Sequence, residues 1–192
     1  MTNRTRIFSL IGIATVLGLT GCPRKEDQPP KPKVTADASA ATAPAAGAKT
    51  ASLPVIAPAP AWKLQDVNGA TVSSEQFKGK VVVLDFWATW CTPCVKEIPG
   101  YIDLARKYEK DGVVIVGVSV DQAGPEVVKA FAAKHKVNYP LVMADEGIVA
   151  AFGGIEAIPT TFLIDRQGQI RDRKEGLAET DEYEKRIVSL LN

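Results

Sequence analysis

Residues 81–99 read VVVLDFWATWCTPCVKEIP and hold two of the three cysteines of this 192-residue chain. The run from Val81 to Ala88 is nearly continuously apolar, as is typical of a strand buried on both faces. The sequence from Cys94 to about Glu109 is predicted to be helical, and Pro93 is tolerated in a first helical turn because its missing N–H would have no partner there. The two cysteines are therefore predicted at the junction of a buried strand and a helix.

Outward from this junction, strands and helices alternate from Trp62 to the end of the chain. Strands are predicted at 62–65, 71–72, 81–88, 113–120, 141–143, 160–164 and 169–174, and helices at about 94–109, 125–136, 146–152 and from 180 onward. Asn68-Gly69 is a tight-turn signal that makes the first two strands a hairpin. The alternation predicts a single α/β domain whose sheet has parallel members and an antiparallel edge.

The amino-terminal segment has the features of a secretory signal peptide. Arg4 and Arg6 precede an apolar stretch from Ile7 to Leu19, which small residues follow. This stretch is shorter than the ~20 residues that a membrane-spanning helix needs, so a plain membrane anchor is the weaker interpretation. Residues 1–21 are therefore predicted to be a cleaved signal.

The end of that segment, Leu19-Thr20-Gly21-Cys22, resembles the lipobox of bacterial lipoproteins, whose cysteine becomes acylated. The resemblance implies lipidation of Cys22 and a location on the periplasmic or extracytoplasmic face of a bacterial membrane, with stable anchoring if more than one acyl chain is attached. The alternative is a soluble secreted protein with a free thiol. A lipid on Cys22 would leave Cys91 and Cys94 as a pair.

Residues 22–57 are rich in proline and alanine and have almost no large apolar side chains. Such a segment buries too little surface to offset the entropy of ordering it, so a disordered tether is expected, followed by a folded domain over 58–192. Without Arg4 and Arg6 the 23 basic residues fall to 21, against 22 acidic ones. This near-neutral balance gives no support for nucleic-acid binding.

Three kinds of site use a Cys-x-x-Cys pair, and two of them fit poorly. Structural zinc usually takes four ligands, whereas this chain offers a pair of thiols and the single His135, which is expected to be a solvated residue at a helix end. A structural disulfide would close only a tiny loop and add little stability. A redox-active pair remains, and no metal or other cofactor is predicted.

The predicted junction suits that redox role. Unpaired N–H groups and a partial positive charge at a helix amino terminus favour a thiolate. Cys91 is expected to be the exposed attacking thiol at this end of the helix. Cys94, one turn further, is expected to be the more buried thiol that resolves a mixed disulfide.

Two acidic residues near the pair are candidates for proton transfer. Asp85 interrupts the apolar strand, and a buried carboxylate there would have a raised pKa, which is typical of functional residues. The alternative is that Asp85 lies at an edge of the sheet and forms hydrogen bonds to the backbone. Glu97 follows Cys94 by three residues, so both can face one side of the helix. It would accept a proton from Cys94 or tune its charge, unless it is an exposed first-turn residue that complements the helix dipole.

The longer pattern resembles the thioredoxin fold and, within it, the membrane-anchored thiol–disulfide oxidoreductases of the TlpA/ResA type. The residues that carry the resemblance are Asp85 to Cys94, Phe77-Lys78-Gly79-Lys80, Glu97-Ile98-Pro99, Ile158-Pro159-Thr160-Thr161 and an added helix and strand at about 125–143. It covers about residues 55–192. It implies a thioredoxin-like α/β fold, with a central mixed sheet flanked by helices, the insertion at 125–143 and an amino-terminal β-hairpin.

The resemblance also implies roles for individual residues. Pro159 would be cis and lie against the sulfurs, which leaves the backbone of Ile158 free to pair with a substrate strand. Trp90, Thr92 and Pro93 complete the expected substrate-binding residues. Asp85 matches the buried acid of thioredoxin and Glu97 the acid of the anchored reductases. Some of those reductases lack the first acid, so the proton route stays open.

The predicted function is reduction of protein disulfides outside the cytoplasm, with apocytochromes c and copper-site assembly factors as example substrates. Electrons would come from a membrane thiol–disulfide donor, because the compartment is kept oxidising. An oxidant or isomerase is the nearest alternative, which the Thr92-Pro93 pair modestly disfavours. A peroxidase would need a threonine spaced ahead of its cysteine, and the sequence has no such motif. A further alternative is a Cu(I) carrier, because soft thiolates suit Cu(I). Copper carriers of related fold, however, have a wider cysteine spacing and a distal histidine near the site, and His135 is poorly placed for that role.

Overall fold

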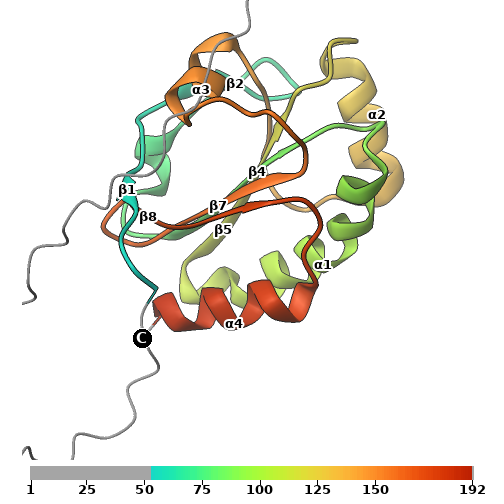
Figure 1. Cartoon of the computed structure of the whole chain (residues 1–192). Helices are drawn as coiled ribbons and strands as arrows, with labels where there is room; N and C mark the ends of the chain where they lie inside the picture. Colours follow the sequence, from blue (N-terminus) through green and yellow to red (C-terminus); the bar gives the residue numbers. More distant parts are fainter. Residues whose placement is uncertain (1–52, 192) are drawn as a thin grey trace, which may run out of the picture. The chain divides into compact units, whose positions relative to one another are not determined.

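The computed structural model describes residues 53–191, which are built around a six-stranded mixed sheet (Figure 1). In spatial order its strands are β1 (Ala57–Pro58), β8 (Gln169–Glu175), β7 (Thr160–Ile164), β4 (Val81–Trp87), β5 (Val113–Ser119) and β6 (Leu141–Met143). A separate hairpin consists of β2 (Lys63–Gln65) and β3 (Thr71–Ser73). The helices are α1 (Thr92–Tyr108), α2 (Pro125–His135), α3 (Glu146–Ala151) and α4 (Thr180–Leu191), with short 3-10 turns at Ser74–Phe77 and Glu109–Asp111.

The sheet is mixed because its strands connect in two ways. The pairs β4–β5 and β5–β6 are parallel and are joined through helices, whereas β4–β7, β7–β8 and β1–β8 are antiparallel. The predicted mixed sheet, the amino-terminal hairpin and the helix and strand inserted at 125–143 are all confirmed.

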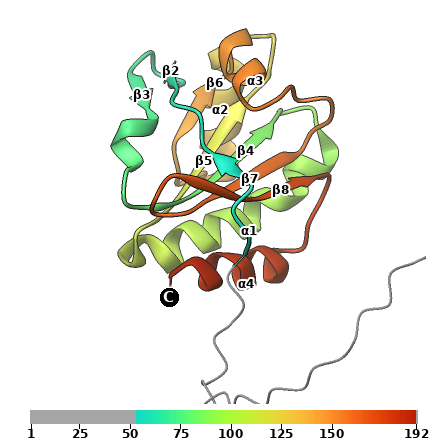
Figure 2. The ribbon, with the colours of Figure 1, turned by 60° about the vertical axis from the view of Figure 1, so that its left-hand side comes forward.

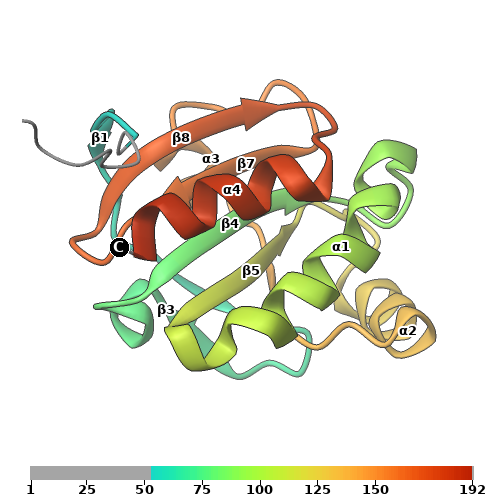
Figure 3. The same ribbon diagram turned by 90° about the horizontal axis from the view of Figure 1, so that it is seen from below.

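Helices cover both faces of the sheet. Figure 3 shows α1 and α4 lying along one face, where they pack on strand residues such as Val83 and Ile115 through Tyr101 and Ile187. The other face is covered by α3 and by the β2–β3 hairpin, whose Leu64 joins the apolar core. The central strand β4 is therefore buried at all of its positions, which explains the apolar run of the sequence.

Residues 53–57, the last part of the segment expected to be a tether, contact the sheet. Residues Ala57–Pro58 form β1, which pairs with β8 (Figure 2). Ahead of it the N–H of Ile56 donates to the carbonyl of Ile170 at 2.8 Å, and the Arg171 guanidinium donates to the carbonyl of Leu53 at 2.7 Å. These bonds attach residues 53–57 to the domain, because the free edge of β8 offers backbone partners.

The predicted signal peptide (1–21), the predicted lipidation site at Cys22 and most of the expected tether lie outside the described residues. Within residues 53–191, none of the helices is long and apolar enough to cross a membrane.

Candidate active site

Cys91 and Cys94 lie where β4 passes into α1, as the sequence predicts. Cys91 is the amino-terminal cap of α1, and its sulfur accepts a hydrogen bond from the main-chain N–H of Cys94 at 3.3 Å. The two sulfurs form a disulfide. Pro93 lies in the first turn of the helix. The same N–H would stabilise a thiolate on Cys91 once the disulfide is reduced.

Cys91 is less exposed than the sequence suggests. It is 5% exposed against 1% for Cys94, so both sulfurs are largely covered. The cover includes the segment before β7, because the Ile158 carbonyl oxygen lies 3.7 Å from the Cys91 sulfur. Trp90, directly before Cys91, is 68% exposed and is the most exposed large apolar side chain of the described residues. The order of burial is as predicted, whereas the predicted exposure of Cys91 is wrong.

The Ile158–Pro159 peptide bond is cis, as the resemblance implies. The Pro159 carbonyl accepts a hydrogen bond from the N–H of Gly176 at 2.8 Å, which ties this turn to the segment after β8. Among the described residues, none accepts a hydrogen bond from the main-chain N–H of Ile158. Pro159 is buried and Ile158 half-buried. This arrangement leaves a backbone donor beside the Cys91 sulfur.

Asp85 lies in the middle of the sheet, so the alternative of an edge position is wrong. Its neighbours across the sheet are Gly117 of β5 and Thr161 of β7, and it is 3% exposed. The Thr161 hydroxyl donates to its carboxylate at 3.0 Å and lies 3.2 Å from the hydroxyl of Tyr101. Burial raises the pKa of Asp85 to about 8; the negative charge of Glu97 adds to the rise, and the Thr161 bond opposes it.

Glu97 is buried as well, at 4% exposure, so the alternative of an exposed first-turn residue is also wrong. One carboxylate oxygen accepts a hydrogen bond from the main-chain N–H of Ala178 at 2.8 Å. The other oxygen is buried without a partner among the described residues. Burial raises the pKa of Glu97 to about 7, against the lowering effects of the Ala178 bond and of the Lys174 charge.

The two acids come from different elements of the fold, but both are buried and both have a raised pKa. Asp85 comes from β4 and Glu97 from α1, and the charge of Glu97 raises the pKa of Asp85. This effect is electrostatic, because a nearby negative charge disfavours ionisation of a second carboxyl group. Both values lie near neutral pH, where a general acid or base exchanges protons most effectively. Each acid can thus hold or release a proton at the pH at which thiol exchange runs.

The sequence reasoning missed Asp121, which is 7% exposed and lies just beyond β5. Its carboxylate accepts hydrogen bonds from the main-chain N–H of Thr89 at 2.9 Å and from the Thr89 hydroxyl at 2.6 Å. Functional residues of open α/β sheets gather at the carboxyl ends of the strands. An acid directly after the predicted strand 113–120 was the signal that could have identified it.

His135 differs from the expected solvated residue. Its ring stacks on Phe131 with the centroids 4.0 Å apart, and the side chain is half-buried. Within residues 53–191, no group of three or more histidine, cysteine or acidic side chains is placed to hold a metal ion.

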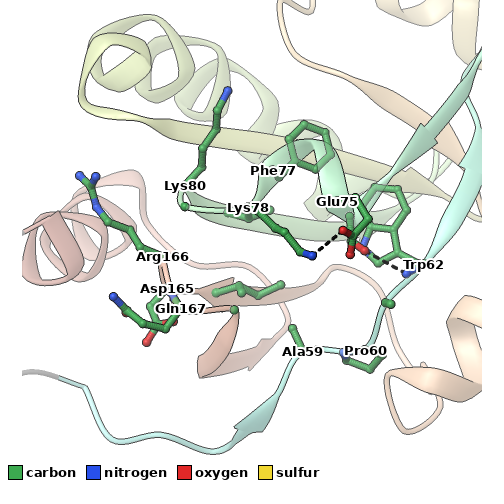
Figure 4. Close-up of a pocket in the computed structure, with 16 residues that line it drawn as sticks. Ala59, Pro60, Trp62, Glu75, Phe77, Lys78, Lys80, Asp165, Arg166 and Gln167 are labelled. Atoms are coloured by element: carbon green, nitrogen blue, oxygen red, sulfur yellow. Dashed lines mark hydrogen bonds and ion pairs between the residues drawn. The ribbon is translucent and has the colours of Figure 1, made fainter.

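A hollow of about 370 Å³ lies at the other end of the sheet, between Trp62, the turn after Ser74–Phe77 and the β7–β8 turn (Figure 4). Its acids are already paired: Glu75 with Lys78 at 2.5 Å, and Asp165 with Arg171 at 2.7 Å. Lys80 and Arg166 extend away from the hollow in Figure 4. Arg166 donates to the carbonyl of Asp111 at 3.0 Å. Both acids and Arg166 thus already have partners, so we assign the hollow no role.

Known proteins are similar to this chain in sequence and in fold. Residues 55–173, more than half of the chain, match the AhpC/TSA family. The thiol-disulfide oxidoreductase ResA of Bacillus thuringiensis subsp. konkukian is 34% identical over 133 residues, which cover 68% of this chain and 76% of that protein. The thioredoxin-like protein YneN of Bacillus subtilis is 34% identical over 130 residues, covering 67% of this chain and 76% of that protein.

Solved structures agree with these relatives. A thiol:disulfide interchange protein of the thioredoxin family from Chlorobium tepidum is 31% identical with a TM-score of 0.67, over 74% of this chain and all (100%) of that one. StoA from Bacillus subtilis is 27% identical with a TM-score of 0.57, over 70% of this chain and 99% of that one. With its cysteine pair at a strand-to-helix junction, the chain belongs to the AhpC/TSA family and is a thioredoxin-like thiol–disulfide oxidoreductase of the ResA type.

Proposed function

We propose that the protein reduces disulfides of other proteins outside the cytoplasm, with Cys91 as the attacking thiol and Cys94 as the resolving thiol. The observation that carries this proposal is the position of the Cys91 sulfur. It accepts a hydrogen bond from the first turn of α1 and lies 3.7 Å from the Ile158 carbonyl, beside an unpaired backbone donor. A thiolate is stabilised there, and an extended substrate has a place to pair.

The reaction begins with the reduced pair. An extended substrate segment pairs with the backbone of Ile158 and packs against Trp90, Thr92, Pro93 and Pro159. The Cys91 thiolate attacks one sulfur of the substrate disulfide, which forms a mixed disulfide and releases the other sulfur as a thiolate. Cys94 then attacks the Cys91 sulfur and releases the second substrate thiol. Two electrons pass from the Cys91/Cys94 pair to the substrate, and the pair ends as a disulfide.

The second step needs a proton acceptor, because Cys94 is 1% exposed and must lose its proton before it attacks. Glu97 lies on the next turn of α1 and Asp85 on the adjoining strand. With pKa values of about 7 and about 8, each acid is ionised in part near neutral pH, Glu97 more than Asp85, and the ionised form can take the proton. We assign the role of proton acceptor to Asp85 and Glu97 together.

The cellular setting of the proposal rests on the sequence. The predicted lipid on Cys22 would hold the domain at the outer surface of a membrane, and residues from 22 onward would act as the tether. A membrane thiol–disulfide carrier would supply electrons in that oxidising compartment. Apocytochromes c and copper-site assembly factors are the proposed kinds of substrate.

The test is reduction of insulin disulfides by the reduced full chain. We expect multiple turnover with a thiol donor, complete loss in Cys91→Ser, and accumulation of a mixed disulfide in Cys94→Ser. The proposal fails if the wild-type dithiol does not reduce insulin, or if Cys91→Ser retains the activity.

The direction of electron flow needs a measurement in cells. Thiol trapping in the native host should find the Cys91/Cys94 pair mostly reduced. A mostly oxidised pair would instead support an oxidant or isomerase. Tight stoichiometric binding of Cu(I) by the reduced chain, without disulfide reduction, would support a copper carrier.

A further inference from the structure

We propose that Asp121 is a positioning residue for Cys91, which acts by holding Thr89 and thereby fixing the loop between β4 and α1. Asp121 does not itself touch the sulfurs in this arrangement. Its effect reaches Cys91 through the main chain of Thr89 and Trp90.

Asp121 forms hydrogen bonds with both Thr89 and Ser119. The Thr89 hydroxyl donates to one oxygen of the Asp121 carboxylate at 2.6 Å. The other oxygen accepts the main-chain N–H of Thr89 at 2.9 Å and the hydroxyl of Ser119 at 2.8 Å. The N–H of Asp121 donates back to the Ser119 hydroxyl at 3.1 Å. Hydrogen bonds to an ionised carboxylate are among the stronger ones in proteins, and this carboxylate is largely buried.

The carboxylate spans the point where two central strands separate. Up to Trp87 and Ser119 the strands β4 and β5 are paired, and the N–H of Val120 donates to the Trp87 carbonyl at 2.9 Å. Beyond this bond the chains diverge, one into the loop before Cys91 and the other toward α2. Beyond it, the hydrogen bonds between Asp121 and Thr89 are a further connection between the two chain segments.

Ala88 and Cys91 are packed in the apolar core, whereas Thr89 and Trp90 between them are not. Only Trp90 separates Thr89 from Cys91, and its side chain is 68% exposed, with no place in the apolar clusters of the described core. The N–H of Cys91 donates to the Ala88 carbonyl at 3.1 Å, which closes a turn around these residues. The Thr89–Asp121 bonds therefore restrain the part of this turn that lies outside the core, and in the proposal they help to orient the Cys91 sulfur toward the Cys94 N–H and the Ile158 carbonyl.

Loss of the contacts between Asp121 and Thr89 should affect some reactions of Cys91 more than others. A sulfur that is poorly oriented still reacts with a small reagent, which can approach from many directions. Reaction with a folded protein disulfide requires alignment of the three sulfurs, and a small misplacement can cost up to about 100-fold in rate. Loss of the Asp121 contacts should therefore slow reduction of a protein disulfide more than it slows alkylation of Cys91.

The experiment compares Thr89→Val with Thr89→Ser and Asp121→Asn in the full chain. Thr89→Val removes the hydroxyl donor without changing charge, and Thr89→Ser keeps it. We expect about a tenfold lower kcat/KM for insulin reduction in Thr89→Val and Asp121→Asn, the scale of one hydrogen bond to a charged group. Iodoacetamide alkylation of Cys91 at a pH where the thiol is ionised should stay within twofold, and Thr89→Ser should react like the wild type.

Asp145→Asn is the matched control. Asp145 also accepts a main-chain N–H, that of Ile148 at 2.8 Å, but at the start of α3. It should lose comparable thermal stability while insulin reduction is unchanged. The proposal is overturned if Thr89→Val and Asp121→Asn reduce insulin at the wild-type rate, if insulin reduction and alkylation slow equally, or if Asp145→Asn shows the same defect.

Discussion

Glu97 of α1 accepts a hydrogen bond from the main-chain N–H of Ala178, 2.8 Å away in the loop between β8 and α4. Gly176 in the same loop donates to the carbonyl of Pro159. One short loop thus contacts both a buried acid and the cis-proline turn beside the cysteines. The side chain of Glu97 has a structural role as an acceptor, and the proposed mechanism adds a chemical role as a base.

The two roles of Glu97 can be separated by substitution. Glu97→Gln keeps a carbonyl oxygen for the Ala178 N–H but cannot take a proton. We expect resolution of the mixed disulfide at pH 7 to slow by about tenfold or more, because general-base assistance typically contributes at least that much. Glu97→Ala should show the same rate defect and also lose about 1–2 kcal/mol of stability with the hydrogen bond.

Quenched reactions analysed by mass spectrometry would measure the decay of the mixed disulfide. Asp85→Asn, measured beside Glu97→Gln, shows which acid is the main acceptor, since the larger defect identifies it. Wild-type resolution rates in both variants would rule out a proton-accepting role for the pair.

The stability of the oxidised protein should decrease from about pH 4 to pH 8. The pKa of Asp85 is 3.8 ordinarily and about 8 in the folded protein, and that of Glu97 rises to about 7. At a pH between the unfolded-state pKa and the folded-state pKa of such a group, the native state binds more protons than the unfolded state. Each raised pKa therefore stabilises the native state fully at low pH, and this stabilisation is lost as the pH rises through the folded-state pKa.

Urea unfolding at pH 5 and pH 8 tests this dependence. We expect the wild type to be less stable at pH 8 by at least about 1 kcal/mol, the linkage expected for one pKa unit. Asp85→Asn removes one titrating group and should show a smaller difference between the two pH values. An unchanged difference in Asp85→Asn would contradict the assignment of the shift to this residue.

Gly117 in β5 should not tolerate a methyl group. A Cβ atom there would lie 2.6 Å from Leu141 Cδ2 and 2.9 Å from Trp87 Nε1, so packed side chains would have to move. Overpacking of this kind costs about 1–3 kcal/mol, and we expect Gly117→Ala to lose that much in urea unfolding. Gly147→Ala in α3 is the comparison. A Cβ there would lie 3.2 Å from an Asp145 oxygen, a tight contact that a small shift of this one side chain relieves, so Gly147→Ala should lose less stability than Gly117→Ala.

Arg171 should hold residues 53–57 against the domain. Its guanidinium donates to the Leu53 carbonyl and forms an ion pair with the buried carboxylate of Asp165. In Arg171→Ala we expect faster hydrogen exchange at the Ile56 amide, whose partner is the Ile170 carbonyl on the same strand. Arg166→Ala, at an exposed residue of the turn between β7 and β8, should leave exchange at Ile56 unchanged. Wild-type protection of Ile56 in Arg171→Ala would show that β1 pairing alone attaches this segment.

Much of the secondary structure follows from local sequence pattern. The apolar run at 81–88 and the position of Pro93 were enough to predict β4, the start of α1 and the placement of both cysteines between them. These features depend on neighbouring residues and on the geometry of a helix terminus, so they can be inferred without the rest of the fold. The strand β1 was not predicted, because two residues carry no pattern and pair only when the edge of β8 is present.

The sequence by itself determined the strand, the helix and the cysteine pair at their junction. The tertiary structure decided which side chains surround that pair. Glu97 was ambiguous on its helix because burial depends on the loop at Ala178, which is distant in sequence and packs over it. Asp121 became a partner of Thr89 only because β5 pairs in parallel with β4 and brings the two strand ends together. The environment of the sulfurs is built by such long-range contacts, and no local pattern encodes them.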